Sequence, residues 1–508
     1  MGTVIMESFA KLQEIVRNIY QLATSVAILR WDLQTYLPPR GFIQRADQLA
    51  YLRTVSHRMM TSKDTIQLID YLEKNNHSLN LEQRRELHLI RRELNQVLKV
   101  PEDLVAAEST QRTVATRSWR KAKQTNNWSL FESDLITLLD ISKRIGEYMM
   151  EGTGAGSPYD ALMDIYEPGM TSDVLKTVFS GLRKQLVPLV GEYSELCKDI
   201  RMDFTNRNIP ITLQKNLVIK VAQYLGYDTI SESAGGRIDS AEHPFTTGYF
   251  EDVRMTVNYK EGDIFQTLFA ALHEIGHSLH KQNQNPKWKW MFLGDSCSSG
   301  INESQSRFIE NLIGRSKEFW EGYYPQFQRQ TENLFNDVSL HEFVQAVNIV
   351  KPSRIRVTAD EMTYALHIII RFEIEQGLFN DRISVKEIPS VWNEKYDHYL
   401  GVRVNNDSEG ALQDTHWAWG MWGYFPTYCL GNLYSAMIQE QLAKDMPNWR
   451  SYLITGDLSR SIGWLRENIH RFSNRYDPAE LIKRLTGRTL TYEPFIKYLK
   501  EKYSNLYS

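Results

Sequence analysis

Two histidines four residues apart, with a glutamate between them, are the residues of this sequence best suited to chemistry. In His273-Glu274-Ile275-Gly276-His277 both imidazoles project from one face of a helix, so both can reach a single metal ion. Glu274 lies to the side of that ion, where it can take a proton from water instead of binding the metal. The pattern predicts a hydrolytic zinc site. The alternative is an ordinary core helix with one buried and one exposed histidine.

The surrounding segment has the periodicity of a helix. Apolar residues recur at spacings of one, three and four from Ile264 to Leu279. Gly276 is the only glycine or proline in this stretch. We interpret it as a small residue where the helix and the ion approach closely. Upstream, apolar and polar residues alternate within 250–259, which predicts a strand, whereas the polar segment 231–247 is typical of a loop.

Glu303 is the best candidate for a third ligand, because a hydrolytic zinc takes three protein ligands and leaves one position for water. Asn302 is a good helix N-cap, which predicts that Glu303 lies in the first turn of a helix packed on the histidine helix. Ser304, Gln305 and Arg307 form a polar cluster that could orient the ligand. The alternative is a glutamate that only interacts favourably with the helix dipole.

Two further clusters lie downstream. Arg356 and Asp360 are four apart at the start of an apolar helical segment, and such a pair is usually an exposed or capping ion pair. Gln413, Asp414 and His416 precede an aromatic run, and buried polar side chains there would need hydrogen-bond partners. A histidine and a phenol near zinc could both donate to an oxyanion.

Composition excludes several classes of protein. The 508 residues carry a net charge of -3 and no basic tail, so a nucleic-acid partner is not expected. Three widely spaced cysteines argue against a disulfide framework and fit a reducing cytosol. No apolar run is long enough to span a bilayer and no signal peptide is recognisable, so we expect a soluble cytoplasmic protein without a membrane partner.

Helical periodicity dominates from end to end, without repeats or flexible linkers. We therefore expect a mainly α, multi-helix protein in which residues 1–508 form a single catalytic unit. Two lobes flank a cleft in this interpretation, and a small β-sheet lies beside the zinc helix.

With these residues in view, the chain resembles the carboxypeptidase Taq family of zinc metallocarboxypeptidases over essentially its full length. The resemblance is carried by H-E-x-x-H at 273–277, D-x-R-x-T at 252–256, I-R-x-x-A-D at 355–360 and G-x-x-Q-D-x-H-W at 410–417. One departure stands out: the family's H-E-S-Q motif is Asn302-Glu303-Ser304-Gln305 here, which keeps the carboxylate and loses the histidine. Residues 278–280 also depart from the usual tyrosine-containing continuation.

The resemblance implies a two-lobed protein with a deep groove, commonly a homodimer, that releases single residues from peptide C-termini. It implies broad side-chain preference, poor action near proline, and one Zn²⁺ per chain that Co²⁺ can replace. The rival hypotheses are a zinc endopeptidase or dipeptidase with the same ligands, and an inactive helical scaffold that binds peptides.

Roles are assigned on the motifs and on this resemblance. His273, His277 and Glu303 hold the metal, Glu274 is the general base, and His416 or Tyr424 donates to the oxyanion.

For the substrate's free carboxylate, Arg356 is the first choice and Arg254 the second. The strand with Asp252 and Thr256 is expected along the groove, paired with substrate backbone, and Gln413 is expected on the substrate side as well. Asp360, Asp414 and Gln305 are candidates for hydrogen bonds to the metal ligands. The alternative for the two aspartates is a structural ion pair.

Overall fold

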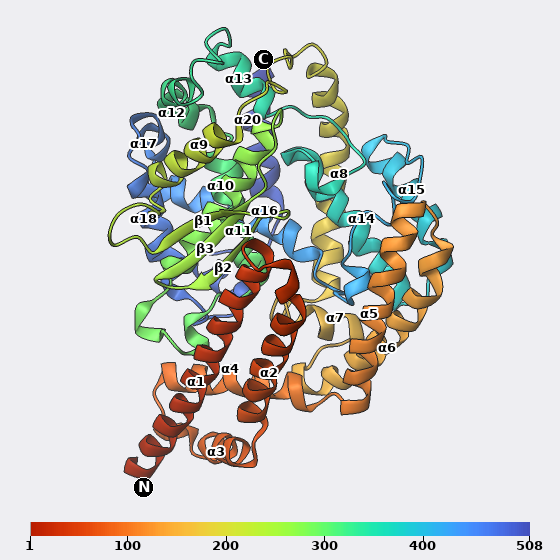
Figure 1. Cartoon of the computed structure of the whole chain (residues 1–508), viewed down its shortest axis with the longest axis vertical. Coiled ribbons are helices and arrows are strands. Elements are labelled where there is room, and N and C mark those ends of the chain that lie inside the picture. Colours follow the sequence, from red (N-terminus) through yellow and green to blue (C-terminus); the bar gives the residue numbers. More distant parts are fainter. Residues whose placement is uncertain (1, 508) are drawn as a thin grey trace.

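A computed structural model of the chain describes residues 2–507, and α-helices make up most of it (Figure 1). The helices are α1 (Gly2–Thr35), α2 (Phe42–Thr61), α3 (Lys63–Lys74), α4 (Leu81–Leu98), α5 (Glu102–Thr125), α6 (Ser129–Thr153), α7 (Pro158–Met163), α8 (Ser172–Leu196), α9 (Ile211–Tyr224), α10 (Ile264–Gln282), α11 (Ser299–Arg307), α12 (Lys317–Gln330), α13 (Leu340–Val347), α14 (Glu361–Phe379), α15 (Ile388–Leu400), α16 (Pro426–Asp445), α17 (Trp449–Thr455), α18 (Leu458–Asn468), α19 (Pro478–Thr486) and α20 (Glu493–Tyr507). The strands are β1 (Gly236–Ser240), β2 (Phe245–Tyr249) and β3 (Asp252–Val257). The predicted fold class is confirmed.

The three strands form one sheet in the order β1-β3-β2. The central strand β3 runs parallel to β1 and antiparallel to β2. The predicted strand within 250–259 is therefore confirmed, and its alternating apolar residues are fully buried. The prediction of a loop over 231–247 was wrong, because β1 and the start of β2 lie there. These strands are only partly buried, so pairing with β3 does not require the apolar alternation that marks β3.

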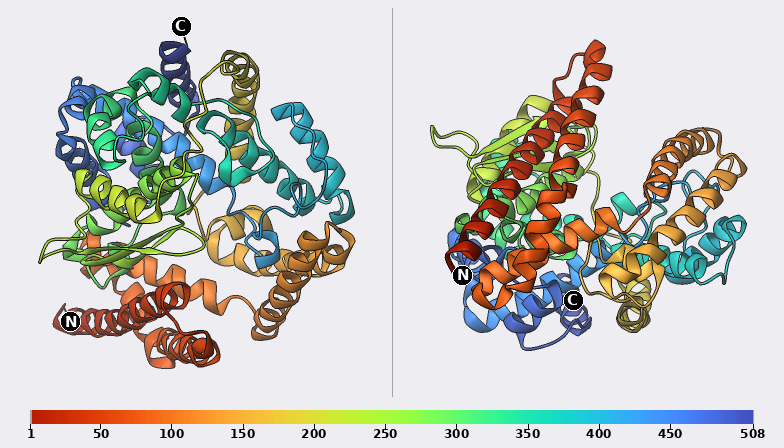
Figure 2. Two further views of the ribbon diagram at one scale, coloured as in Figure 1. Left: turned by 45° about the horizontal axis from the view of Figure 1, so that its top comes forward. Right: turned by 90° about the horizontal axis from the view of Figure 1, so that it is seen from below.

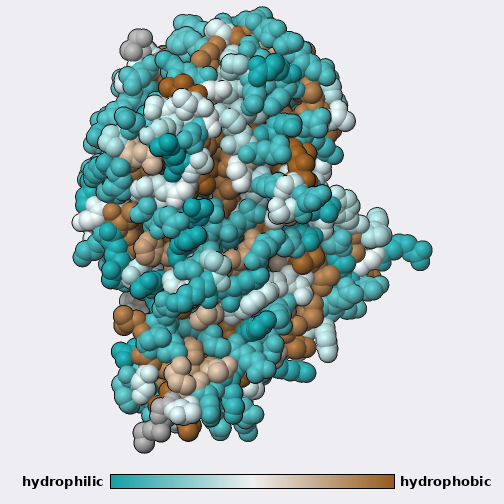
Figure 3. Space-filling model, turned by 90° about the vertical axis from the view of Figure 1, so that its left-hand side faces the viewer, coloured by the Kyte–Doolittle hydropathy of each residue, from teal (hydrophilic) through white to brown (hydrophobic). Residues whose placement is uncertain are grey.

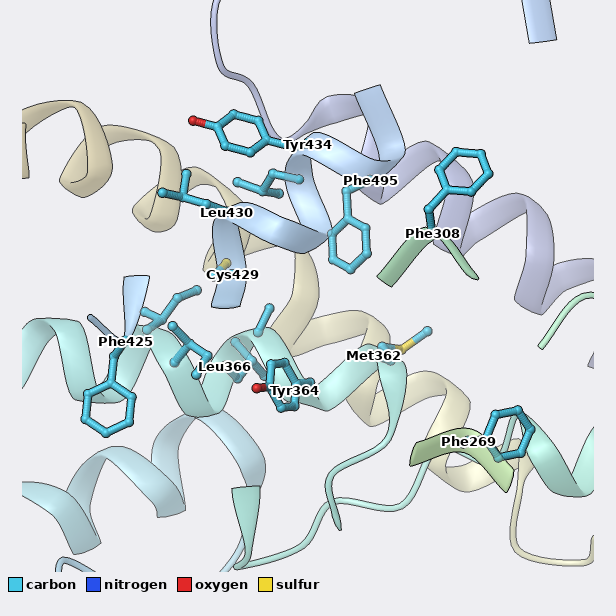
Figure 4. Packing of buried hydrophobic residues seen from close by; sticks show 14 of the residues in the cluster. Phe269, Phe308, Met362, Tyr364, Leu366, Phe425, Cys429, Leu430, Tyr434 and Phe495 are labelled. Atoms are coloured by element: carbon cyan, nitrogen blue, oxygen red, sulfur yellow. The ribbon is translucent and has the colours of Figure 1, made fainter. Parts of the chain in front are cut away.

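Helix α10 packs against β2 and β3 on one side and against α11 on the other, and α11 in turn packs on α16. Helix α14 is buried almost all round, and its side chains meet those of α16 in the large apolar core (Figure 4). Helices α10, α11, α14 and α16 are thus connected to one another by packing in the large apolar core.

The first four helices have a small apolar core of their own, contributed by α1, α3, α4 and the end of α2. Tyr249 at the end of β2 and Phe292 pack against that cluster. Figure 2 shows two lobes, with α5, α6 and α15 in one and the sheet with α10 in the other. The expectation that 1–508 is a single catalytic unit stays a prediction.

Hydrophilic side chains predominate on the face shown in Figure 3, where apolar groups are scattered. No helix within residues 2–507 is both long and apolar enough to cross a bilayer. The three cysteines are buried and free, as their number and spacing predicted.

Candidate metal centre and active site

The two histidines lie on one face of α10, as their spacing predicts. Their ring centroids are 4.8 Å apart. Each presents its Nε2 atom to one oxygen of Glu303, at 3.7 Å from His273 and 3.6 Å from His277. The three side chains are mostly buried, with 19%, 13% and 9% of their surfaces exposed.

Glu303 lies in the second turn of α11. Ser298 caps this helix, because its backbone is extended and its hydroxyl accepts a hydrogen bond from the Ile301 N–H at 3.0 Å. The prediction that Asn302 is the cap, with Glu303 in the first turn, was wrong. The predicted packing of this helix on the histidine helix is confirmed.

Gly276 is required by the contact between these two helices. A Cβ atom on Gly276 would lie 2.6 Å from the Gln305 carbonyl oxygen and 2.6 Å from the Ser306 Cα atom. The close approach that this glycine permits is therefore between α10 and α11, and our interpretation of an approach to the ion is corrected.

The donor set fits a divalent cation. One nitrogen from each histidine and one oxygen of Glu303 lie within 4.8 Å of one another. Ligands about 2.0–2.1 Å from a tetrahedral ion are about 3.4 Å apart, close to the two nitrogen–oxygen distances given above. Imidazole nitrogens and a carboxylate are also the ligands expected of a hydrolytic metal site with an open position.

Glu310 is the carboxylate that holds a candidate ligand in place. The Nδ1 atom of His273 lies 3.0 Å from Glu310 Oε2, which leaves Nε2 for a metal. Glu310 belongs to a π-helical segment, Phe308–Ile313, that continues α11. Such segments are common at functional sites. Our reading of the sequence did not single out Glu310, although it follows Glu303 at the helical spacing of seven.

The charges around the donors keep both carboxylates ionised. Burial would raise the pKa of the Glu303 carboxyl, but His273 and Arg307 outweigh it and lower the pKa to about 2. Burial also opposes ionisation of Glu310, yet Arg307 and His273 hold its pKa far below the usual range. Without a metal, burial lowers the pKa of His273, while Glu303 and Glu310 raise it above its ordinary value.

Glu274 is 7% exposed and faces the sheet. The Thr246 hydroxyl on β2 donates to Glu274 Oε2 at 2.5 Å, and β2 lies at the edge of the sheet. The strand expected along the substrate, with Asp252 and Thr256, is instead the central one, and both its neighbours already pair with its backbone. Its expected pairing with substrate is therefore wrong, because the edge strands are β1 and β2.

The remaining members of the D-x-R-x-T motif have local partners. Asp252 pairs with Arg254 at 2.7 Å, and the Arg254 guanidinium lies 4.4 Å from the Trp31 ring centroid on α1. Thr256 is fully buried, and its hydroxyl donates to the His243 carbonyl.

Arg356 is buried beside a second arginine that sequence reasoning missed. Asp414 accepts from Arg356 Nη2 at 2.7 Å and from Arg371 Nε at 2.7 Å. Asp360 does not join this pair: it caps α14, accepting from two backbone N–H groups there. Gln413 bonds to backbone groups, including the Arg356 N–H at 2.9 Å, and so fixes the segment that carries Arg356.

His416, Tyr424 and Tyr428 form an aromatic group near Glu303. The His416 and Tyr424 rings are 5.7 Å apart, and His416 Nε2 lies 3.3 Å from the Tyr428 hydroxyl. Burial lowers the pKa of His416 to about 4, although Asp414 partly offsets it. Burial and the charge of Glu303 raise the pKa of Tyr424 to about 12. At neutral pH the imidazole is neutral and the phenol protonated, so either can donate a hydrogen bond.

The two departures from the family motifs meet in the fold. His280 Nδ1 lies 3.0 Å from Asn302 Oδ1, so the two unusual residues are hydrogen-bonded to each other. Gln305 bonds instead to His470 Nε2, at 2.9 Å. Asn302 also lines an open cavity of about 810 Å³ between the N-terminal helices and α10 and α11.

Two histidines and a glutamate converging beside an ionisable Glu274, within a mostly helical fold, are the arrangement of a metal-dependent hydrolase. The family model described as carboxypeptidase Taq (M32) metallopeptidase matches residues 11–503. The chain belongs to that family, and it is a metallocarboxypeptidase.

Relatives of this chain match over nearly their whole length. It is 38% identical to carboxypeptidase 1 of Bacillus subtilis (strain 168), covering 97% of each protein. It is 35% identical to thermostable carboxypeptidase 1 of Thermus thermophilus, covering 98% of this chain and 99% of that protein. Among solved structures, the M32 carboxypeptidase from Deinococcus radiodurans R1 is similar with a TM-score of 0.94, at 33% identity and 99% coverage of both chains.

Proposed function

We propose that this metallocarboxypeptidase uses one Zn²⁺ per chain, held by His273, His277 and Glu303, to release single amino acids from peptide C-termini. The main support for this proposal is that the Nε2 atoms of both histidines lie close to one Glu303 oxygen, at 3.7 and 3.6 Å. Co²⁺ is expected to replace Zn²⁺, since the same imidazole and carboxylate donors suit both ions.

Zn²⁺ at this position would act as a Lewis acid and lower the pKa of water towards about 7. Glu274 is the general base in this proposal, and Thr246 holds one of its oxygens, so that the other is oriented for proton transfer. Glu274 then passes the proton to the leaving amine. His416 or Tyr424 donates a hydrogen bond to the developing oxyanion, which their protonation states at neutral pH support.

Recognition of a free C-terminus is assigned to Arg356. Arg356 and Arg371 share the single carboxylate of Asp414, so the cluster has one uncompensated positive charge. A buried excess charge is costly until an anion pairs with it, and a substrate carboxylate supplies that anion. Arg254 is the weaker choice, because its guanidinium is already paired with Asp252, whose side chain is 51% exposed.

The edge strand β2 is the proposed platform for the peptide backbone. A peptide bound along β2 would add a strand through main-chain hydrogen bonds. Because these bonds do not depend on the side chains of the peptide, they are consistent with broad specificity. Proline has no N–H to donate, so proline near the scissile bond is expected to weaken binding.

End-group analysis of a digested peptide tests the proposal. Stepwise loss of one residue from the C-terminus, abolished by chelation and restored by Zn²⁺, is expected. Internal fragments or released dipeptides would instead indicate an endopeptidase or dipeptidase, and no cleavage with metal bound would indicate an inactive peptide-binding scaffold. A homodimer in the cytoplasm completes the proposal, and equilibrium sedimentation tests the dimer.

A further inference from the structure

Arg307 lies between the two carboxylates of the candidate metal centre. Its Nε atom donates to Glu303 Oε1 at 2.8 Å, and its Nη1 atom donates to Glu310 Oε2 at 3.2 Å. The Tyr364 ring centroid lies 4.2 Å from the guanidinium carbon, and 11% of the arginine side chain is exposed. The guanidinium is therefore fixed on several sides.

The two oxygens of Glu303 consequently have different partners. Oε1 accepts from Arg307, whereas Oε2 is the oxygen that faces the Nε2 atoms of His273 and His277. A carboxylate can bind a metal through one oxygen or through both, and binding through both would occupy the position that water needs. An oxygen already bonded to arginine is poorly available to the metal.

We propose that Arg307 is a positioning residue that makes Glu303 bind the metal through Oε2 alone and so keeps one coordination position for water. This inference rests on the metal site assigned in the proposed function. The same guanidinium orients Glu310, which bonds to His273 Nδ1, so one side chain orients two of the three ligands.

The role requires the shape of arginine as well as its charge. The Nε and Nη1 atoms belong to one planar group and donate to two different carboxylates, those of Glu303 and Glu310. These two residues precede and follow Arg307 by four and three positions. Lysine supplies the charge at one atom and cannot make both bonds with this geometry.

The test compares three variants by Zn²⁺ competition with a chromogenic chelator and by the visible absorption of the Co²⁺-loaded proteins. Arg307→Gln removes the charge, and Arg307→Lys keeps it without the fork. Arg315→Gln is the matched control, because Arg315 lies 3.4 Å from Glu310 Oε1 and has no bond to Glu303.

We expect Arg307→Gln to weaken Zn²⁺ binding by about 10- to 100-fold. In both Arg307 variants the Co²⁺ absorption should lose intensity, because coordination by both Glu303 oxygens raises the coordination number. Arg315→Gln should keep the wild-type spectrum. If circular dichroism shows that Arg307→Gln does not fold, the Co²⁺ absorption spectrum of Arg307→Lys decides between the outcomes.

Wild-type affinity and spectrum in the folded Arg307 variants would overturn the inference. An equal spectral change in Arg315→Gln would also overturn it, because charge balance at Glu310 would then explain the effect. Failure of the wild-type protein to bind Zn²⁺ or Co²⁺ would instead overturn the proposed metal site itself.

Discussion

A methyl group added at Gly276 tests whether contact between α10 and α11 sets the metal geometry. In Gly276→Ala the new Cβ would lie 2.6 Å from the Gln305 oxygen and the Ser306 Cα, where ordinary contacts begin at 3.4 Å. The two helices must therefore separate by about 0.8 Å, the difference of these values. Both atoms belong to the backbone of the helix that carries Glu303, so the carboxylate moves with it.

The expected cost follows from two opposing effects. Overpacking at such a contact costs about 1–3 kcal/mol, and the better helix propensity of alanine returns about 1 kcal/mol. Gly191→Ala is the matched control, because it replaces a helical glycine whose Cβ would meet nothing within 4 Å. It should gain up to about 1 kcal/mol, so Gly276→Ala should be less stable than this control by about 1–3 kcal/mol.

Urea unfolding of the metal-free proteins measures the difference in free energy, and chelator competition measures Zn²⁺ affinity. Metal sites tolerate ligand displacements of only about 0.2 Å, so we expect Gly276→Ala to bind Zn²⁺ more weakly than wild type while Gly191→Ala does not. If Gly276→Ala matched the control in stability and the wild type in Zn²⁺ affinity, contact between α10 and α11 would not set the metal geometry.

Three other predictions concern single side chains. Glu274→Gln should keep Zn²⁺ stoichiometry and lose on the order of a thousandfold in kcat; near wild-type turnover would remove Glu274 as the base. Arg356→Ala should lower kcat/KM for free-acid peptides by roughly 10- to 100-fold and much less for C-terminally amidated ones, whereas equal losses would indicate a structural arginine. Burial raises the pKa of Glu167 from 4.5 to about 7, so protonated Glu167 stabilises the fold at low pH. That contribution, roughly 3 kcal/mol, is lost as pH rises through 7. The unfolding free energy of Glu167→Gln should therefore rise relative to wild type between about pH 5 and pH 8, and a pH-independent difference would contradict this.

Sequence reasoning succeeded where the information is local. The helical period places His273 and His277 on one face whatever the rest of the chain does. Alternation marks β3 because Val253, Met255 and Val257 are buried while the intervening residues at its start are polar and less buried. It failed for β1 and β2, whose backbone pairing with β3 does not depend on apolar residues. The predicted start of α11 was also wrong. Asn302 and Ser298 are both good N-cap residues, and only the backbone conformation shows that Ser298 is the cap.

The supporting residues were harder to predict because packing brings them together. Thr246 reaches Glu274 from a strand, and Arg371 reaches Asp414 from the neighbouring α14, and neither pairing leaves a signal in the spacing. Arg307 and Glu310 differ, since they follow Glu303 at four and seven residues. Arg307 belongs to the polar cluster already predicted to orient Glu303, and a search for charged residues at helical spacing from each candidate ligand would have found Glu310 as well.

Diffraction from crystals of the Zn²⁺-loaded protein, recorded at the zinc absorption edge, would locate the metal and identify its ligands. We expect one anomalous peak per chain, bonded to the Nε2 atoms of His273 and His277 and to Oε2 of Glu303, with Oε1 still held by Arg307. A peak elsewhere, or none between the two imidazoles, would contradict the proposed metal site.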